Sequence, residues 1–136
     1  FENVVNRMRA FAIEILEPED ILLNMNVSPK LDHIVLNMQQ RKNLYLLFKE
    51  AINNIAKYAG CKNVWVDINI HSGKIMMKIK DDGKGFSQSL PGTGNMATLG
   101  GNGLNNMQKR AKELNGKIAI DSAIGQGTEV ILEFPA

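Results

Sequence analysis

The stretch NLYLLFKEAINNIAKYAG, residues 43–60, has two chemically opposite faces when it is wound as an α-helix. At about 100° per residue, its leucine, phenylalanine, isoleucine and alanine side chains gather mostly on one wide face. With Glu50 set at zero, Asn54 falls at about +40°, Lys57 at about −20° and Asn53 at about −60°. The segment therefore predicts a core helix that carries a narrow polar stripe on the side away from the core.

The polar stripe offers the groups that a magnesium–phosphate site uses. An asparagine carbonyl oxygen can bind Mg²⁺, a glutamate can bind or orient a water, and a lysine neutralises phosphate. Asparagine is also a poor helix former, so Asn53 and Asn54 each cost roughly a few tenths of a kcal/mol relative to alanine. An ordinary solvated helix face would show the same spacing, and the stripe alone does not decide between the two.

Apolar periodicity and turn residues divide the rest of the chain into helices and strands. We expect a helix over 2–16, stopped ahead of Pro18, a strand over 20–27, and the long helix over about 37–59 with Gly60 as its stop. Alternating residues over 64–70 and 75–79 predict an antiparallel pair joined at Ser72-Gly73, followed by a long loop over 81–103, a helix near 104–115 and a hairpin of strands near 117–122 and 127–134. The predicted fold class is α+β: one domain over 1–136, a two-layer α/β sandwich whose mixed, mainly antiparallel sheet is covered on one face by helices.

Two glycine-rich segments stand out within the long loop. In DDGKGF, residues 81–86, the glycines at 83 and 85 let the backbone turn sharply and approach a flat ligand. A carboxylate just before them, Asp81, can accept a hydrogen bond from an exocyclic amine such as that of adenine. A plain Asp-Gly turn is the alternative explanation.

The second segment, GGNGLNNMQKRA over 100–111, leads from glycines directly into a helix. The free N–H groups and the positive dipole end of a helix start suit phosphate. The segment is neither a P-loop nor a dinucleotide fingerprint, because it lacks the Gly-Lys-Ser/Thr ending and a directly preceding strand. A flexible linker followed by a capped helix remains the alternative.

Composition sets outer limits on function. A formal charge of +2 with 22% charged residues is nearly balanced and gives no indication of nucleic-acid binding. The one cysteine, Cys61, excludes an internal disulfide and a cysteine metal cluster. No apolar run reaches the length needed to span a bilayer. Because the chain begins at Phe1, we expect it to be a fragment of a longer protein.

The order of these segments resembles that of the GHKL ATPase superfamily. Residues 43–60 look like its N box, DDGKGF resembles the Asp-x-Gly-x-Gly box, GGNGL resembles the Gly-x-Gly box, and GQGTEV over 125–130 resembles the final glycine-threonine box. The closest resemblance is to the catalytic, ATP-binding domain of bacterial two-component sensor histidine kinases. This implies the Bergerat fold, ATP and Mg²⁺ as ligands, and an ATP lid over 87–102.

The resemblance also implies roles for individual residues. Asp81 would bind the adenine amino group, and Thr128 would reach back towards it. Asn54 would coordinate Mg²⁺, with Glu50 beside the metal, and Lys57 would contact the phosphates. It assigns catalysis to Glu50, Asn54 and Lys57, the metal to Asn54 and Glu50, and nucleotide binding to Asn53, Asn54, Lys57, Tyr58, Asp81, Gly83, Gly85, Phe86, Gly101, Gly103, Leu104 and Thr128.

A histidine kinase needs a phospho-accepting histidine, and neither His33 nor His71 lies in a helix beside an acidic residue. We therefore expect the acceptor on a dimerisation domain upstream of Phe1, with residues 1–17 either ending its helix or covering this domain. The resemblance further implies a downstream response regulator, no nucleic-acid partner, and a homodimeric, membrane-attached parent whose catalytic domain is cytoplasmic. The alternatives are an anti-sigma-factor-type serine kinase and a non-catalytic nucleotide-binding interaction module.

Overall fold

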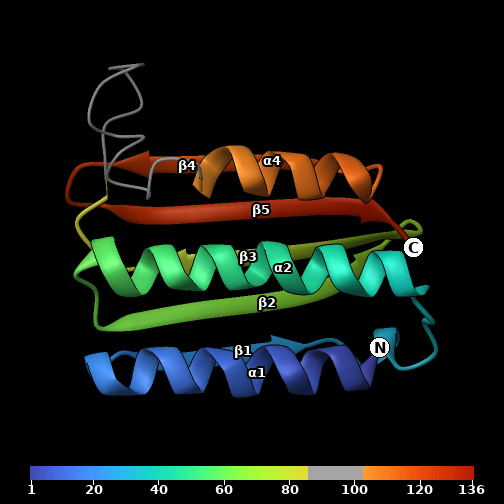
Figure 1. Ribbon diagram of the computed structural model, residues 1–136, viewed down its shortest axis with the longest axis horizontal. Coiled ribbons are helices and arrows are strands. Elements are labelled where there is room, and N and C mark those ends of the chain that lie inside the picture. Colours follow the sequence, from blue (N-terminus) through green and yellow to red (C-terminus); the bar gives the residue numbers. More distant parts are fainter. Residues whose placement is uncertain (86–102) are drawn as a thin grey trace.

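The computed structural model describes residues 1–85 and 103–136, and in them the strands form one five-stranded sheet in the order β1-β2-β3-β5-β4. The strands are β1 (Leu22–Val27), β2 (Asn63–His71), β3 (Lys74–Asp81), β4 (Lys117–Ala123) and β5 (Gly127–Pro135). Strands β1 and β2 run parallel, whereas the other neighbouring pairs are antiparallel. Figure 1 shows helices α1 (Glu2–Leu16), α2 (Met38–Asn54) and α4 (Gly103–Glu113) together on one face of this sheet. The predicted α+β fold class is confirmed.

The alternation read from the sequence decides which face of the sheet is covered. On β2, Val64, Val66 and Ile68 are buried, while the side chains between them, such as Trp65 and Asp67, face the other way and are exposed. Strands β3 and β5 alternate in the same manner. The core therefore lies between the inward residues of these strands and the apolar faces of the helices.

Helix α2 is the central element of the helical layer. It begins at a capping box, in which Asn37 Oδ1 accepts the backbone N–H of Gln40 at 2.8 Å and Gln40 Oε1 accepts that of Asn37 at 3.0 Å. Its buried face consists largely of leucine, phenylalanine, alanine and isoleucine side chains, as predicted. Gly60, with φ of 60°, closes the helical segment in a left-handed conformation that glycine adopts without steric cost.

The last turn of this segment departs from the prediction. Residues Ile55–Ala59 form a π-helix rather than a continuation of the α-helix. A π-helical turn has a wider repeat, so the spacing of about 100° per residue stops applying beyond Asn54. The predicted angle of Lys57 relative to Glu50 was therefore wrong, although the two side chains belong to the same helical segment.

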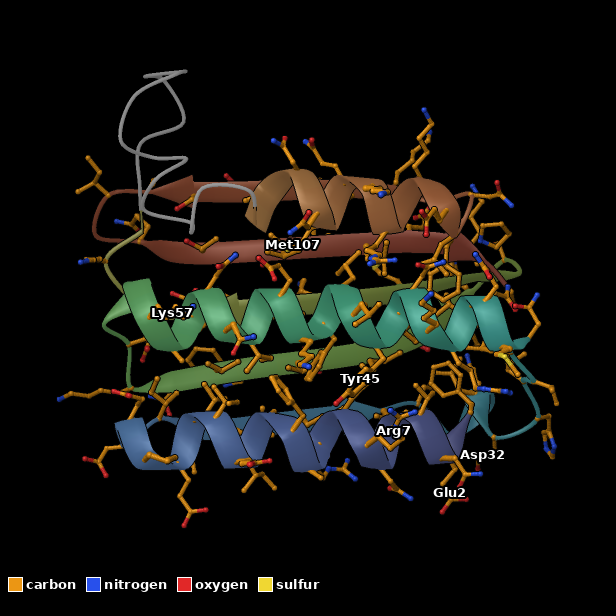
Figure 2. All side chains as sticks on the ribbon, viewed as in Figure 1. Glu2, Arg7, Asp32, Tyr45, Lys57 and Met107 are labelled. Atoms are coloured by element: carbon orange, nitrogen blue, oxygen red, sulfur yellow. The ribbon has the colours of Figure 1, made fainter. Side chains whose placement is uncertain are left out.

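Helix α1 packs against both α2 and β1. Its inward side chains, Val4, Val5, Met8, Ala12 and Leu16, are buried. Between the helices, the Arg7 guanidinium lies 4.6 Å from the centroid of the Tyr45 ring (Figure 2). The Phe11 ring lies edge-on to Tyr45, with 6.2 Å between the ring centroids. The helices of the described residues are too short or too polar to cross a membrane.

Candidate functional site

Asp81 is the last residue of β3, and its carboxylate is almost fully buried, with 2% of the residue exposed. One carboxylate oxygen accepts the backbone N–H of Gly83 at 2.8 Å. Burial raises the pKa of Asp81 above its ordinary value, and the nearby charge of Asp82 adds to this, while backbone hydrogen bonds from Gly83 and Thr128 oppose it. Asp81 forms no ion pair with any residue in 1–85 or 103–136. A buried carboxylate without a cation is an expensive feature for a fold to keep.

Asp82 fixes the loop that follows Asp81. Its carboxylate accepts the backbone N–H groups of Lys62 and Asn63, each at 2.9 Å, and the Asn63 side-chain amide at 3.0 Å. These hydrogen bonds hold the pKa of Asp82 below its usual value. The loop after β3 is thereby tied to the start of β2, and the neighbouring Asp81 is held pointing into the helical side of the sheet.

The next loop residues dock against the turn between β4 and β5. The Lys84 carbonyl accepts the backbone N–H of Gly125 at 2.7 Å. Gly85 has φ of +63°, and a Cβ at this position would collide with the backbone carbonyls of Ala123 and Gly127. Both its conformation and its surroundings therefore require glycine, and the Asp-Gly motif forms a fixed loop rather than a free turn.

Thr128 lies opposite Asp81 in the β3–β5 ladder. Its hydroxyl is 2.9 Å from that of Ser122, and the Ser122 hydroxyl donates to the Gly127 carbonyl at 3.1 Å. Gly127 has φ of +77°, and a Cβ there would meet the Asp81 carbonyl oxygen. The glycine-threonine motif thus lets β5 approach the end of β3 closely and sets a hydroxyl next to the buried carboxylate.

The polar stripe of α2 forms the second half of the site. Asn54 is 8% exposed, and its side-chain Nδ2 has no hydrogen-bond partner among the residues that the structure describes. Glu50 and Asn53 are half-buried and Lys57 is exposed. Leaving a buried amide nitrogen unpaired costs stability, which makes Asn54 a candidate site residue.

The two halves of the site lie at the same end of the molecule. Figure 1 shows that the C-terminal end of α2, the end of β3 and the start of β5 all reach this end, and Figure 2 shows Lys57 there. The fold thus brings Glu50, Asn53, Asn54 and Lys57 to the end that also carries Asp81, Gly83, Gly85 and Thr128. Gly103 begins α4 and Tyr58 lies in the π-helical turn, whereas Phe86, Gly101 and the predicted lid over 87–102 lie outside the described residues.

A groove between α2 and α4 extends the site beyond the predicted residues. It has a volume of about 340 Å³ and is lined by Leu46, Lys49, Glu50, Asn53, Asn106 and Arg110. Glu50 and Asn53 were predicted, but Lys49, Asn106 and Arg110 were not. The i, i+4 spacing of Asn106 and Arg110 on a helix that follows the glycine-rich segment is the signal that could have indicated them.

Comparison with known proteins places this arrangement in a family. Residues 39–136 match the family of histidine kinase-, DNA gyrase B- and HSP90-like ATPases. Sensor histidine kinase YdfH of Bacillus subtilis is 31% identical over 104 residues, which are 76% of this chain and 25% of YdfH. Oxygen sensor histidine kinase NreB of Staphylococcus carnosus is 36% identical over 92 residues, which are 68% of this chain and 25% of NreB. The chain thus spans about a quarter of the length of these relatives.

Solved structures show the same fold at low sequence identity. The histidine kinase domain of the blue-light activated histidine kinase from Erythrobacter litoralis superposes with a TM-score of 0.76 at 18% identity, over 97% of this chain and 60% of that one. The mycobacterial sensor histidine kinase MprB gives a TM-score of 0.70 at 19% identity, over 98% and 93% of the two chains. The chain belongs to the histidine kinase-, DNA gyrase B- and HSP90-like ATPase family.

Proposed function

We propose that this chain binds Mg-ATP and is the catalytic domain of a sensor histidine kinase, donating the γ-phosphoryl group to a histidine on an upstream dimerisation domain. The observation that carries the proposal is the buried Asp81 carboxylate, which lacks an ion pair in the described residues and sits beside a loop shaped by Gly85. Such a carboxylate is suited to a ligand's amino group. We propose a histidine as the phosphoryl acceptor because the relatives YdfH and NreB are sensor histidine kinases.

In this proposal each half of the site has a separate task. Asp81 accepts a hydrogen bond from the adenine amino group, with Thr128 beside it. Gly85 lets the loop dock against the β4–β5 turn, which fixes the backbone beside Asp81. At the other half, the Asn54 carboxamide and Glu50 offer oxygen ligands for Mg²⁺, and Asn53 and Lys57 face the phosphates. Bound Mg-ATP supplies the phosphoryl group and the metal charge that neutralises it.

The donor set of the described residues fits a magnesium ion that is held mainly by phosphate oxygens. Residues 1–85 and 103–136 contain no cluster of histidine, cysteine and carboxylate side chains that could cage a metal by themselves. Mg²⁺ keeps several waters and commonly takes only one or two protein ligands when nucleotide phosphates are present. One buried carboxamide, binding through its oxygen, and one neighbouring carboxylate therefore form an adequate protein contribution.

The proposal extends to the partners of the whole protein. We infer a homodimeric, membrane-attached parent that keeps this domain in the cytoplasm and passes the phosphoryl group to a response regulator. An anti-sigma-factor-type serine kinase is less well supported, because the relatives include sensor histidine kinases and a signal transduction histidine-protein kinase/phosphatase.

Kinase activity can be tested on the full-length parent. Incubation with ATP labelled in the γ-phosphate should transfer label to the protein, and the label should be lost in acid and kept in alkali, as a phosphohistidine requires. The isolated chain, which contributes no acceptor in this proposal, should remain unlabelled. Acid-stable label on the parent, or acid-stable label on a partner protein that hydroxylamine does not remove, would contradict the proposal and favour a serine kinase, because hydroxylamine cleaves the acyl phosphate of a response regulator.

The role of Asp81 predicts a selective loss of nucleotide binding. Asp81→Asn replaces an acceptor with a group that also presents donors to the adenine amine, and we expect Mg-ADP affinity to fall about tenfold or more by isothermal titration calorimetry. Asp67→Asn makes the same change at an exposed position of β2 and serves as the control. Unchanged Mg-ADP affinity in a folded Asp81→Asn protein would show that the assignment is wrong.

The raised pKa of Asp81 predicts how stability depends on pH. Because its pKa is higher in the folded state, the wild type loses stability as pH rises from the ordinary value of 3.8 through the folded pKa. Asp81→Asn removes this loss. In urea unfolding, the variant should gain stability relative to wild type as pH rises through that window, and the difference should then level off. If the stability of Asp81→Asn relative to wild type fell as pH rises, the burial of a charged Asp81 would be contradicted.

Asn54 is predicted to be retained for its ligand rather than for the fold. Asn54→Leu replaces a buried amide that has an unpaired nitrogen with an apolar side chain of similar shape, so the unfolding temperature should stay level or rise. The same variant should lose the increase in ATP affinity that Mg²⁺ confers on the wild type, measured by titration with and without the metal. A variant that unfolds at a lower temperature yet keeps the Mg²⁺ effect would assign Asn54 to the fold instead.

A further inference from the structure

The inward-facing side chains of the sheet change from apolar to polar at the end that carries Asp81. Residues directly opposite each other on neighbouring strands point to the same face, so the strand register defines rows of side chains across the sheet. The row that includes Asp81 crosses four strands and consists of Val64, Asp81, Thr128 and Ser122. The next inward row is entirely apolar and consists of Val66, Ile79, Val130 and Ile120. Ser122 is thus the third polar member of the row at the candidate site, and it lies outside the motifs identified in the sequence.

Ser122 is buried, and its hydroxyl has a defined direction. The residue is 7% exposed. A hydroxyl has one hydrogen to donate and lone pairs that accept, whereas a carbonyl oxygen can only accept. The hydrogen bond of 3.1 Å between Ser122 Oγ and the Gly127 carbonyl is therefore donated by Ser122. Because the hydrogen is engaged there, Ser122 Oγ faces Thr128 with its lone pairs.

The contact between the two hydroxyl groups then sets the role of Thr128. Ser122 Oγ lies 2.9 Å from Thr128 Oγ1, which is the distance of a hydrogen bond that one of the two must donate. Since the Ser122 hydrogen points to Gly127, Thr128 is the donor. Thr128 Oγ1 is left with lone pairs for any other group, so it acts as an acceptor towards a ligand.

Asp81 and Thr128 together form a pair of acceptors. They lie opposite each other in the β3–β5 ladder, and the Thr128 backbone N–H contributes a hydrogen bond to the Asp81 carboxylate. An exocyclic amino group carries two N–H donors and can satisfy both acceptors. A carbonyl oxygen in the same place would face only lone pairs and leave buried polar atoms unpaired, which costs affinity. The pair therefore favours an amino group over an oxo group on the ligand.

We propose that Ser122 is a positioning residue that fixes the Thr128 hydroxyl as an acceptor, so that the site selects a 6-aminopurine nucleotide over a 6-oxopurine nucleotide. This inference rests on the proposed function, because it requires the purine amino group at Asp81. Without the Ser122 hydroxyl, the Thr128 hydroxyl can rotate and present its hydrogen to a carbonyl oxygen of the ligand or to Asp81. Ser122 therefore acts through Thr128 and needs no contact with the ligand itself.

Titration calorimetry with two nucleotides tests the inference without relying on catalysis. Inosine diphosphate carries a carbonyl oxygen where ADP carries the amino group, and its affinity can be measured by displacement of ADP. Ser122→Ala should lower the ratio of ADP affinity to inosine diphosphate affinity, both with Mg²⁺, by about fivefold, which corresponds to one neutral hydrogen bond. Ser28→Ala removes the hydroxyl that caps the turn after β1, and it should leave both affinities unchanged. Ser28 hydrogen-bonds to Ile68 on β2, whereas Asp81 lies opposite Val64.

A double-mutant cycle shows whether Ser122 acts through Thr128. Thr128→Val removes the acceptor and keeps a β-branched side chain, so the affinity ratio should also fall. Adding Ser122→Ala to Thr128→Val should then change the ratio by less than about twofold, because the group that Ser122 positions is already gone. Effects on the ratio that add up would give Ser122 an independent role and overturn the inference.

The remaining outcomes separate the inference from the function on which it rests. Equal losses for both nucleotides in Ser122→Ala, together with a lower unfolding temperature, would show that Ser122 only ties β4 to β5 and would overturn the inference. If Ser122→Ala does not fold, Ser122→Cys has a side chain of similar size with a weakly hydrogen-bonding thiol and should give the same fall in the ratio. An unchanged ratio in the folded variant would overturn the inference as well. Wild-type protein that binds neither nucleotide at millimolar concentration would instead remove the proposed function, whereas wild-type ADP binding with a lowered ratio in the variant supports both.

Discussion

The packing of α2 on the sheet is the constraint on which the rest of the structure depends. Its buried face, with Leu44, Leu47, Phe48 and Ile52, fixes the rotation of the helix about its own axis. Once that rotation is set, Glu50 and Asn53 must face the groove beside α4, and Asn54 must lie at the border between core and site. One helix therefore supplies the centre of the core and half of the candidate site. A change in core packing that shifts this helix would also move the site residues.

The adjacent residues Asp81 and Asp82 at the end of β3 have different roles, one in the candidate site and the other in holding the loop. Asp82 is surrounded by N–H donors and has a lowered pKa, so it stabilises the loop in its charged form. Asp81 points into the protein, has a raised pKa, and costs stability when charged. Asp82 thus offsets part of the cost of burying its neighbour. The sequence Asp-Asp-Gly places these opposite roles one residue apart because successive side chains of an extended backbone point to opposite faces.

The elements and their order could be predicted from the sequence because they depend on local periodicity. Alternating residues on β2 and β3 and the apolar face of α2 indicated the layers, and glycine at 85 indicated a tight loop. The π-helical turn over Ile55–Ala59 could not be predicted, because no residue pattern in that segment distinguishes it from a continued α-helix. The contact of Arg110 with Asn43 was equally out of reach, since it joins helices separated by the whole length of β2 and β3. Contacts between elements that are distant in the sequence could not be predicted, because tertiary packing decides which elements lie next to one another.

Burial and the neighbouring carboxylates at the end of β3 together raise the pKa of the chain's one cysteine. Cys61 is buried just before β2, and burial together with the charges of Asp81 and Asp82 raises its pKa to about 11. Its sulfur therefore remains a protonated thiol at neutral pH and is a poor nucleophile towards oxidants and disulfides. Burial, reinforced by the charges of the two carboxylates, thus keeps the only thiol in the chain protonated and slow to oxidise.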